Sequence, residues 1–492
     1  MDEQNNKIPE NQEVEIDENK TSKIGFLQKI TDEVKNIPKN LLVMGATAFA
    51  IFIIAIVLVL VLENGNSKNN NDTPTEVHTS YDAFTFYPLS SNTYTVAIAP
   101  EGKYYEEIII PSTYNDGTVV EIAKEGFKEC EKLYSIKIPN TVETIGESAF
   151  ENCPLSTVKF TNSVKTVEYN AFKNTSVDSV YFEGNLYDWC SIHFYNSDAS
   201  PLENFSSKSY RNTYYRSDGT NLYFYNQLVT EITLNNSTSN FSGCNSLKKV
   251  TIQCPYLSYA AFEGCTSLES VTLPEGIDRI DDSTFEGCIS LKNINIPSSV
   301  TTIGFYAFRQ CKSLTNVNIP DKVSKIYDYA FEDCTSLESI TLPNGITEIS
   351  KSTFEGCSSL KNINIPSSVT QVGESAFADC NTLESITLPN GIMEIKENTF
   401  KGCSSLKDIV LPGALLTIWN YAFEGCTSLE SITLPHFISA IYYQAFKDCS
   451  SLKNIHYQGD KFMWNYTVTR SKEWDKNTGD YIIYCTDGNI EK

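Results

Sequence analysis

A unit of 23 residues recurs nine times between Phe262 and Phe446 without an insertion or a deletion. Every copy has Phe at its first position, Cys three residues later and Leu six residues later, and all copies but the last have Pro twelve residues later. A unit this short cannot bury an apolar face by itself, so each copy must be covered by its neighbours. The sequence therefore predicts a solenoid of stacked coils.

The spacing inside the unit predicts its local structure. A period of about 20 to 29 residues built around L-x-x-[VI]-x-[IL] is typical of leucine-rich-repeat coils. In the first copy, Val271 and Leu273 alternate with polar residues, which indicates a short half-buried strand that Pro274 ends. Ile277 and Ile280 indicate a second extended stretch, and the Ala-Phe end of the unit indicates a brief helical turn that points Phe inward. The expected fold is a leucine-rich-repeat solenoid, mainly parallel β-structure with short helical turns.

The residues that follow the repeat Leu form a column of mostly charged side chains, which supports parallel stacking in register. Opposite charges on neighbouring strands gain roughly 0.2 to 1 kcal/mol and like charges cost a similar amount, and no like charges are neighbours in this column. We interpret it as a structural ladder. The column is the residue that follows the repeat Leu, which is in order Glu269, Lys292, Thr315, Glu338, Lys361, Glu384, Lys407, Glu430 and Lys453.

The regular array has irregular segments on both sides. Phe127 and Phe150 begin degenerate copies, whereas Trp189 and many Tyr, Asn and Ser residues replace the pattern further on. Trp464 and Trp474 replace it again near the C-terminus, as expected for a cap. The predicted segments are an Asn-rich stalk at 63–90, an N-terminal cap with degenerate repeats at 91–182, an irregular inserted module at 183–241, regular 23-residue repeats at 242–460 and a C-terminal cap at 461–492.

A single transmembrane helix is predicted before the stalk. Leu41 to Leu62 is a run of 22 residues without a charge, and a helix of that length, about 33 Å, spans a hydrocarbon core of roughly 30 Å. Forty mostly hydrophilic residues precede it, which argues against a cleavable signal peptide. The excess of lysines before this run places residues 1–40 in the cytoplasm. The expected location is the plasma membrane, single-pass, with the repeats outside the cell or in a lumen continuous with the outside.

The cytoplasmic tail leaves two interpretations open. Apolar residues recur at helical spacing beside lysines in its second half, from Ile24 to Ile37. This pattern fits a short helix on the inner leaflet, and it also fits an adaptor-binding segment.

Composition and motifs argue against several functions. A net charge of -23 disfavours nucleic acid, which requires a basic surface to replace counterions. The four histidines are scattered, and no Gly-rich phosphate loop or H-E-x-x-H motif is present. We therefore expect no catalytic residues, no cofactor and no metal site, and the chain is predicted not to be an enzyme.

Nine of the fifteen cysteines occupy one repeating position, from Cys265 to Cys449. Neighbouring members would lie about 5 Å apart, a distance that also permits disulfides. A buried thiol nevertheless behaves as a small apolar side chain. Occupation of a single repeat position therefore favours free, buried thiols.

Two surfaces are candidates for ligand binding. The first is the solvent side of the strands, where polar side chains recur; it could equally be a ladder that only solvates the sheet. The second is a set of aromatic residues just before the Ala-Phe of several coils, which could anchor a partner or shield a turn. The strand candidates are Asn293, Asn295, Asn316 and Asn318, and the aromatic candidates are Tyr327, Tyr329, Trp419, Tyr421, Tyr442 and Tyr443.

Sequons for N-glycosylation avoid the regular array. If they are used, glycans would cover the stalk, the module and the cap, and would leave the repeats bare for contact. The candidate asparagines on the predicted outer side are Asn71, Asn174, Asn204, Asn235, Asn236, Asn240 and Asn465.

The unit from Ser359 to Cys380 resembles the BspA-like (Treponema-type) leucine-rich repeats of bacterial and protist surface proteins. The single membrane anchor is similar to that of protist, trichomonad-type members, although here it precedes the array. The resemblance implies attachment to a protein or glycan ligand on host cells, extracellular matrix or other microbes, with self-association as a further possibility. It implies no particular binding residues. An adhesin or recognition protein is the leading hypothesis; an endocytic or signalling receptor that acts through its tail, or a variable surface antigen, is the alternative.

Overall fold

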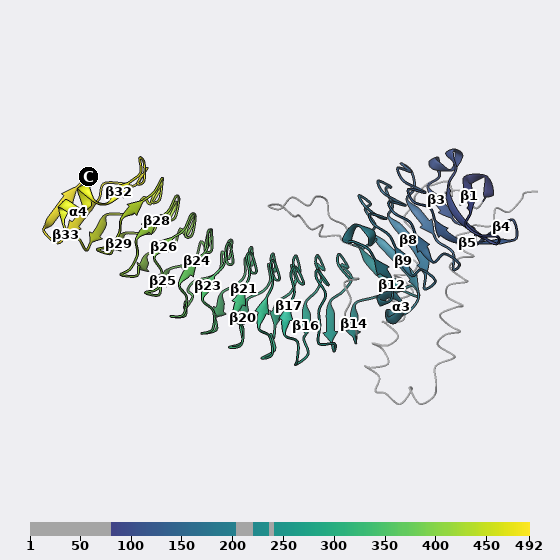
Figure 1. The fold of residues 1–492 in the computed structure, drawn as a ribbon, viewed down its shortest axis with the longest axis horizontal. Coiled ribbons are helices and arrows are strands. Elements are labelled where there is room, and N and C mark those ends of the chain that lie inside the picture. The colour runs from purple at the N-terminus through teal and green to yellow at the C-terminus, as the bar shows by residue number, and fades with distance from the viewer. Residues whose placement is uncertain (1–79, 203–219, 236–240) are drawn as a thin grey trace, which may run out of the picture. The chain divides into compact units, whose positions relative to one another are not determined.

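A computed structural model of the chain describes residues 80–202, 220–235 and 241–492 (Figure 1). The chain divides into two units, Met1–Pro74 and Thr75–Lys492, and the first of them lies outside the described residues. The predicted tail, the predicted transmembrane helix and most of the predicted stalk therefore lie outside them as well. No helix among the described residues has the length and apolar character needed to span a bilayer.

Each regular coil contributes two short strands to two parallel sheets. In the coil that begins at Phe262, β16 (Ser270–Thr272) pairs with β18 (Asn293–Ile294) of the next coil, and β17 (Arg279–Ile280) pairs with β19 (Thr302–Ile303). The pairing register is one full repeat, so like positions in successive coils lie side by side. The predicted leucine-rich-repeat solenoid is therefore confirmed.

We call the surface of the longer strands the strand face and the surface formed by the residues around the repeat Phe the turn face. Between β22 and β25 the strand ladder is reduced to a bridge from Asn362 to Ser385. The strand face from residue 231 onward consists of β14 (Glu231–Leu234), β15 (Lys249–Ile252), β16, β18, β20 (Asn316–Asn318), β22 (Ser339–Thr341), β25 (Ser385–Thr387), β27 (Asp408–Val410), β29 (Ser431–Leu434) and β31 (Asn454–Tyr457). The opposite sheets contain β17, β19, β21 (Lys325–Ile326), β23 (Glu348–Ile349), β24 (Gln371–Val372), β26 (Glu394–Ile395), β28 (Thr417–Ile418), β30 (Ala440–Ile441) and β32 (Thr469–Arg470).

The repeat Phe residues form a continuous stack through the core. The rings of Phe262 and Phe285 lie 5.9 Å apart at 5°, and those of Phe400 and Phe423 lie 5.4 Å apart at 14°. Each of these side chains is fully buried, and burial of one Phe contributes about 1.5 to 3 kcal/mol. Because every coil covers the ring of the coil before it, no coil could retain this core alone.

The turn around the repeat Phe is not the brief helix that the sequence predicted. Ser283 and Gly287 have φ of 53° and 71°, and left-handed residues two positions before and two after Phe285 interrupt a right-handed helix. The backbone N–H groups of these three residues donate to carbonyls of the next coil at 2.8 to 2.9 Å. Alternate N–H groups of the turn therefore donate to the next coil, as in a sheet, while those between them donate within the coil, and the segment stays a succession of turns.

The cysteine column is buried and reduced, as predicted. The Sγ of Cys288 donates to the carbonyl of Phe262 in the preceding coil at 3.2 Å, and Cys357 makes the same contact with Phe331. All the cysteines in the described ranges are free. A thiol fills this position because it is small and apolar and can donate a second hydrogen bond to a carbonyl that already accepts one backbone N–H, as that of Phe262 does from Cys265.

The N-terminal boundary of the solenoid lies earlier than predicted. The predicted stalk includes residues 81–90, but η2 (Tyr81–Ala83) and β1 (Phe84–Pro88) are folded, and β1 pairs antiparallel with β2 (Thr93–Ile98). Phe84 is buried against Phe127 at a ring distance of 6.5 Å. This hairpin covers the end of the core. The aromatic residues of β1 are the feature of the sequence that indicates a folded strand here.

A first stack of coils, residues 80–230, has its own strand face. That face ends in an antiparallel hairpin, so its ladder does not continue into β14. The strand face contains β3 (Glu107–Ile109), β6 (Ser135–Lys137), β8 (Thr157–Thr161), β10 (Ser179–Glu183), β12 (Asn221–Phe224) and β13 (Gln227–Leu228). The opposite sheet contains β1, β2, β5 (Gly117–Ile122), β7 (Thr144–Ile145), β9 (Thr166–Val167) and β11 (His193–Phe194), with β4 (Thr113–Tyr114) paired to β5; η3 (Pro100–Tyr104) follows β2.

The predicted irregular module at 183–241 is instead an ordered end cap in its described residues. After β10 the chain forms α3 (Leu186–Cys190), whose N-cap Asn185 accepts hydrogen bonds from two backbone N–H groups, and then β11 and η4 (Ser197–Ala199). Trp189 on this helix is fully buried. The hairpin of β12 and β13 then closes the sheet.

The C-terminal cap repeats this arrangement. After β31 the chain forms α4 (Lys461–Tyr466) with N-cap Asp460, then β32, and it ends with the hairpin of β33 (Ile482–Cys485) and β34 (Gly488–Glu491). Trp464 on α4 is buried as Trp189 is. A Cβ at Gly184 would meet the ring of Phe182, and one at Gly459 would meet the ring of Tyr457. The chain therefore contains two capped stacks, the second at residues 231–492.

Candidate ligand-binding surfaces

The predicted asparagines lie on the strand face of the second stack and all four are exposed. Asn293 and Asn316 occupy the same register position on paired strands. The Oγ of Ser339 donates to Oδ1 of Asn316 at 2.6 Å, and the amide of Asn316 donates to Thr315 at 3.3 Å. This part of the row is a polar ladder. Asn295 and Asn318 are the remaining candidates for ligand contact on this face.

The charged column beside the strand face stacks in register. The N–H of Glu338 donates to the carbonyl of Thr315, and the N–H of Glu384 to that of Lys361, both at 2.9 Å. Lys292 and Glu269 form an ion pair at 3.5 Å with side chains that are 62% and 49% exposed. An exposed pair of this kind contributes about 0 to 1 kcal/mol, so the column assists register more than stability.

The predicted aromatic residues divide into two clusters on the turn face. The first cluster contains Phe305, Tyr306, Tyr327 and Tyr329. The rings of Tyr306 and Tyr329 stack at 4.9 Å and 12°, those of Phe305 and Tyr327 lie 4.5 Å apart, and Lys325 lies over Tyr327 at 4.7 Å. All four residues of this cluster are partly buried, so they both shield the turns and retain surface for contact.

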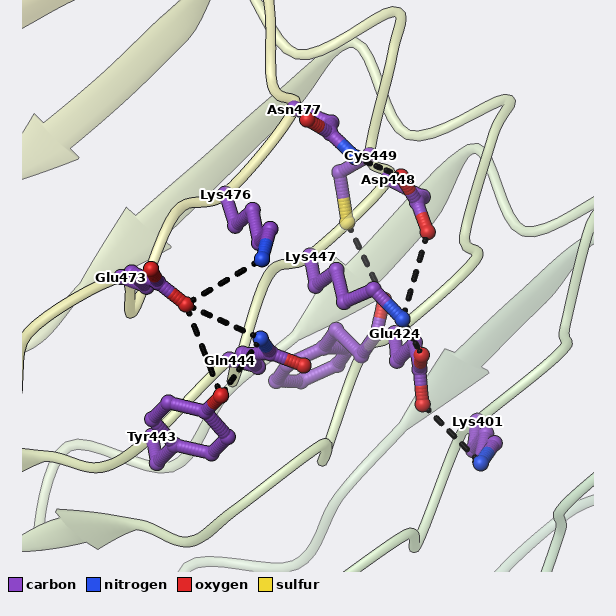
Figure 2. Close-up of polar contacts among 11 residues, drawn as sticks. Lys401, Glu424, Tyr443, Gln444, Lys447, Asp448, Cys449, Glu473, Lys476 and Asn477 are labelled. Atoms are coloured by element: carbon purple, nitrogen blue, oxygen red, sulfur yellow. Dashed lines mark hydrogen bonds and ion pairs between the residues drawn. The ribbon is translucent and has the colours of Figure 1, made fainter.

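The second cluster contains Trp419, Tyr421, Tyr442 and Tyr443. Trp419 and Tyr442 stack at 4.5 Å and 4°, and Tyr421 packs edge-on against Tyr443 at 5.7 Å. Figure 2 shows the hydroxyl of Tyr443 directed at Glu473, to which it donates at 3.4 Å. The C-terminal cap thus holds one member of this cluster in place.

Ion pairs run along the turn face at the position that follows the repeat Phe. Arg309 lies between Glu286 at 3.1 Å and Glu332 at 2.5 Å, and its side chain is only 4% exposed. In later coils Glu424 lies between Lys401, at 3.0 Å, and Lys447 (Figure 2). These charges are shared between coils, which keeps the turn face rigid.

A recess of about 700 Å³ interrupts this surface between the two clusters. Ser352 and Ser375 occupy the position that Tyr306 and Tyr329 occupy in the two preceding coils, and Ala378 occupies the position after the repeat Phe, where Arg309 and Glu332 form their ion pair. Three small side chains in adjacent coils therefore leave a hollow. Tyr329 and Lys401 line it together with Glu332, Glu355 and Asp379.

The recess is electrostatically acidic. Burial raises the pKa of Glu332 to about 7, although Arg309 beside it opposes this shift. Burial also raises the pKa of Glu355, and Asp379 and Asp333 raise it further. At the position that follows the repeat Phe, Glu355 has Ala378 as its neighbour in the next coil, whereas Glu286, Glu332 and Glu424 each pair with a cation. Within the described ranges, no group of His, Cys, Asp and Glu is arranged to hold a metal ion.

Sequence reasoning missed Phe305, Tyr306 and the recess. The two aromatic residues lie at the same distance before the repeat Phe as the predicted ones, so alignment of the nine units by position could have found them. The recess depends on small residues, which give no signal in a search for functional side chains. Its detection requires that Ala378 be compared with the charged residues that follow the repeat Phe in other coils.

Three of the predicted sequon asparagines, Asn174, Asn235 and Asn465, are exposed. Asn465 lies on α4 and Asn174 follows the repeat turn of a degenerate coil. The remaining four lie outside the described residues. Their glycosylation stays a prediction.

Comparison with known proteins identifies the family. The family described as BspA type leucine rich repeat region matches residues 101–217, 220–338, 256–384 and 324–453. No curated protein matches the chain.

Three of the solved structures with similar chains are bacterial proteins. A leucine rich cell surface protein from Faecalibacterium prausnitzii is 26% identical, with 81% of this chain and 99% of that chain covered and a TM-score of 0.44. A leucine-rich repeat protein from Bacteroides ovatus is 25% identical, with 82% and 99% covered and a TM-score of 0.47. The pneumococcal vaccine antigen PcpA is 18% identical, with 79% and 96% covered and a TM-score of 0.48. Since the family match extends over more than half of the residues, the chain belongs to the family of BspA type leucine rich repeat proteins.

Proposed function

We propose that the chain is a non-enzymatic cell-surface adhesin or recognition protein. Its solenoid would bind a protein or glycan ligand on host cells, extracellular matrix or other microbes, and the predicted helix at Leu41 to Leu62 would anchor it in the plasma membrane with the repeats outside. A leucine-rich-repeat solenoid is typically a binding scaffold. The observation that carries the proposal is the turn face, where two aromatic clusters flank a recess.

The turn face has the properties of a contact surface. Trp and Tyr are enriched among the residues that contribute most to binding, because they bury a large area with few rotatable bonds. Here the rings are already stacked between coils, as for Trp419 with Tyr442 and Tyr306 with Tyr329. Binding would therefore cost little side-chain entropy.

Attachment assays with variants of the full chain test this proposal. Cells that display the chain would be applied to immobilised extracellular matrix and to epithelial monolayers. Substitution of Trp419 and Tyr442 by Ser, with Tyr329→Ser, should reduce saturable attachment about tenfold or more, the effect of losing one or two interface anchors. Matched controls are Tyr104→Ser and Tyr256→Ser, which remove exposed tyrosines elsewhere. Attachment that does not saturate, or that the turn-face variants leave unchanged, would contradict the proposal.

Two further experiments separate the alternatives. Deletion of residues 1–36 should leave attachment intact if the chain is an adhesin, whereas a signalling receptor should lose its response. A variable antigen without a ligand predicts that the purified repeats bind nothing saturably. Antibody labelling of a tag after Lys492 on intact cells should succeed; labelling only after permeabilisation would contradict the outward orientation.

A further inference from the structure

The strand face of the first stack carries a row of four long polar side chains. Lys137 on β6, Lys159 on β8, Tyr181 on β10 and Tyr223 on β12 are paired in register from strand to strand. Neighbouring strands lie about 4.8 Å apart, so the row extends over about 14 Å. We call these four residues the Lys-Tyr row.

The two lysines place like charges on neighbouring strands. Like charges on neighbouring strands repel, and the charged column of the second stack never places them side by side. Lys137 and Lys159 are direct neighbours, and neither forms an ion pair within the described part of the chain. Lys137 is exposed and Lys159 is partly buried, and in a chain with a net charge of -23 the pair is a local concentration of positive charge.

The two tyrosines are partly buried and stack on each other. Their rings stack at 4.5 Å and 14°, and the ammonium of Lys159 lies 5.7 Å from the centre of the Tyr181 ring. One face of each ring is therefore covered by the other tyrosine. The edge of an aromatic ring is electropositive and the hydroxyl is a hydrogen-bond donor. The row thus offers two ammonium and two phenol donors in a line.

The second stack supplies an internal comparison. In its cap, His456 and Tyr484 occupy the positions of Tyr181 and Tyr223 and stack at 4.9 Å and 19°. The position of Lys159 is there occupied by Thr433. The aromatic pair is therefore part of the cap architecture, whereas the lysines are not required by it.

A recess of about 530 Å³ adjoins the row beside Lys137. Ile109, Pro111 and Pro139 form apolar parts of its lining, and Thr161 and Glu183 contribute polar atoms. Glu183 lies on the same face as the row, two residues after Tyr181. A carboxylate here would accept hydrogen bonds from neutral hydroxyl groups.

We propose that the Lys-Tyr row binds an anionic glycan. A polysaccharide chain carries carboxylate or sulfate groups for the lysines and hydroxyl groups for the phenols, for Thr161 and for Glu183. An acidic peptide would be matched by the two lysines alone. This site lies on a different face and a different stack from the aromatic clusters, so it goes beyond the function proposed above.

Binding of labelled polysaccharides to the full chain tests the proposal. Fluorescence anisotropy would be measured with heparin, which carries sulfate and carboxylate, with hyaluronan, which carries carboxylate alone, and with neutral dextran. Lys137→Ala combined with Lys159→Ala should weaken heparin binding about tenfold or more. The matched control is Lys248→Ala with Lys249→Ala, which removes the same charge from the second stack and should leave binding unchanged. Raising the salt concentration should weaken the wild type more than the double variant.

A second pair of variants isolates the phenols. Tyr181→Phe with Tyr223→Phe keeps the stacked rings and removes only the hydroxyls, and it should weaken binding about fivefold. Thermal unfolding of each variant should match the wild type, which shows that the fold is retained. Binding of heparin alone would assign sulfate as the recognised group, and binding of both polymers would assign carboxylate as sufficient.

Other outcomes would overturn the proposal. They are no binding of either polymer, equal binding by the lysine variants, equal binding by dextran, and displacement of heparin by poly-glutamate at the same charge concentration. The turn-face variants Trp419→Ser and Tyr442→Ser should bind heparin normally. Loss of attachment through the turn face and loss of heparin binding are thereby distinguished.

Discussion

Replacement of Trp189 by Ala should destabilise the first stack and leave the second nearly unchanged. Trp189 is fully buried, with ring centroids 5.3 Å from Phe182 and 5.8 Å from Phe160 and Phe194. It fills the space beneath the last coil of that stack. Removal of the indole would leave a cavity at the end of the core, where no further coil of the same sheet can collapse onto it.

The size of the effect follows from burial. A Trp→Ala change in a core costs about 3 to 5 kcal/mol. For a folding unit of about 150 residues, each kcal/mol lowers the midpoint of thermal unfolding by roughly 2 to 4 °C, so the expected decrease is about 6 to 20 °C. Trp464→Ala in the second cap is the matched variant, and it should lower the stability of the second stack.

Differential scanning calorimetry separates these effects. The stacks share one hydrophobic core, but the strand ladder between them is reduced to a bridge from Thr220 to Cys244, beside hydrogen bonds such as that from the N–H of Asn245 to the carbonyl of Thr220 at 2.8 Å. In a solenoid each coil interacts with its neighbours only, so a junction with few bonds limits cooperativity. Each variant should shift a different transition. A single transition that both variants shift equally would refute the interpretation of residues 183–230 as a cap.

Three other predictions concern the turn face and the cysteine column. Because the pKa of Glu332 is raised to about 7 in the folded chain, ionisation of this group opposes folding as pH rises from 4.5. The free energy of unfolding of Glu332→Gln, measured with urea, should therefore rise by up to about 3 kcal/mol relative to that of the wild type between pH 4.5 and 8. A difference that does not depend on pH would contradict this. Arg309→Ala should cost about 3 to 5 kcal/mol in the same assay at pH 8, since Glu286 and Glu332 would remain buried without their cation. Burial raises the pKa of the Cys357 thiol, so maleimide should label it only after unfolding, while the partly exposed Cys485 should react in the folded chain; early labelling of Cys357 would show that the column opens.

The regular coils could be predicted because their physics is periodic. Each buried position contacts the same position in the next coil, so Phe, Cys, Leu and Pro recur at a constant interval, and the interval alone gives the register. The prediction of a helical turn is wrong, because an Ala-Phe ending has the composition of a helix end but not its backbone conformation here. Its left-handed residues, such as Ser283 and Tyr306, are ordinary side chains whose φ depends on hydrogen bonds to the next coil.

The structure of the caps could not be predicted from periodicity, since a cap occurs once per stack and has no period. Trp189 and Trp464 occupy equivalent positions, but the segments that lead from each helix to the closing hairpin differ in length. The signals that recur in the described residues of both caps include a Gly two residues after an aromatic residue, a helix N-cap and a buried Trp. They become evident when Gly184 is compared with Gly459, because a Cβ at either position would meet the ring of the aromatic residue two positions earlier.

The capped stacks also explain where this chain can vary. Ser290 to Val300 and Ser359 to Val369 have identical sequences three repeats apart. Because buried columns contact only like residues of neighbouring coils, a whole coil can be gained or lost within the second stack without changing a core contact type. Such a change would move the aromatic clusters of the turn face relative to one another, whereas the Lys-Tyr row lies in a stack whose coils are degenerate and whose closing hairpin fixes its length. A variable contact surface and a constant one can therefore coexist in one chain, and the internal cap is the element that keeps them separate.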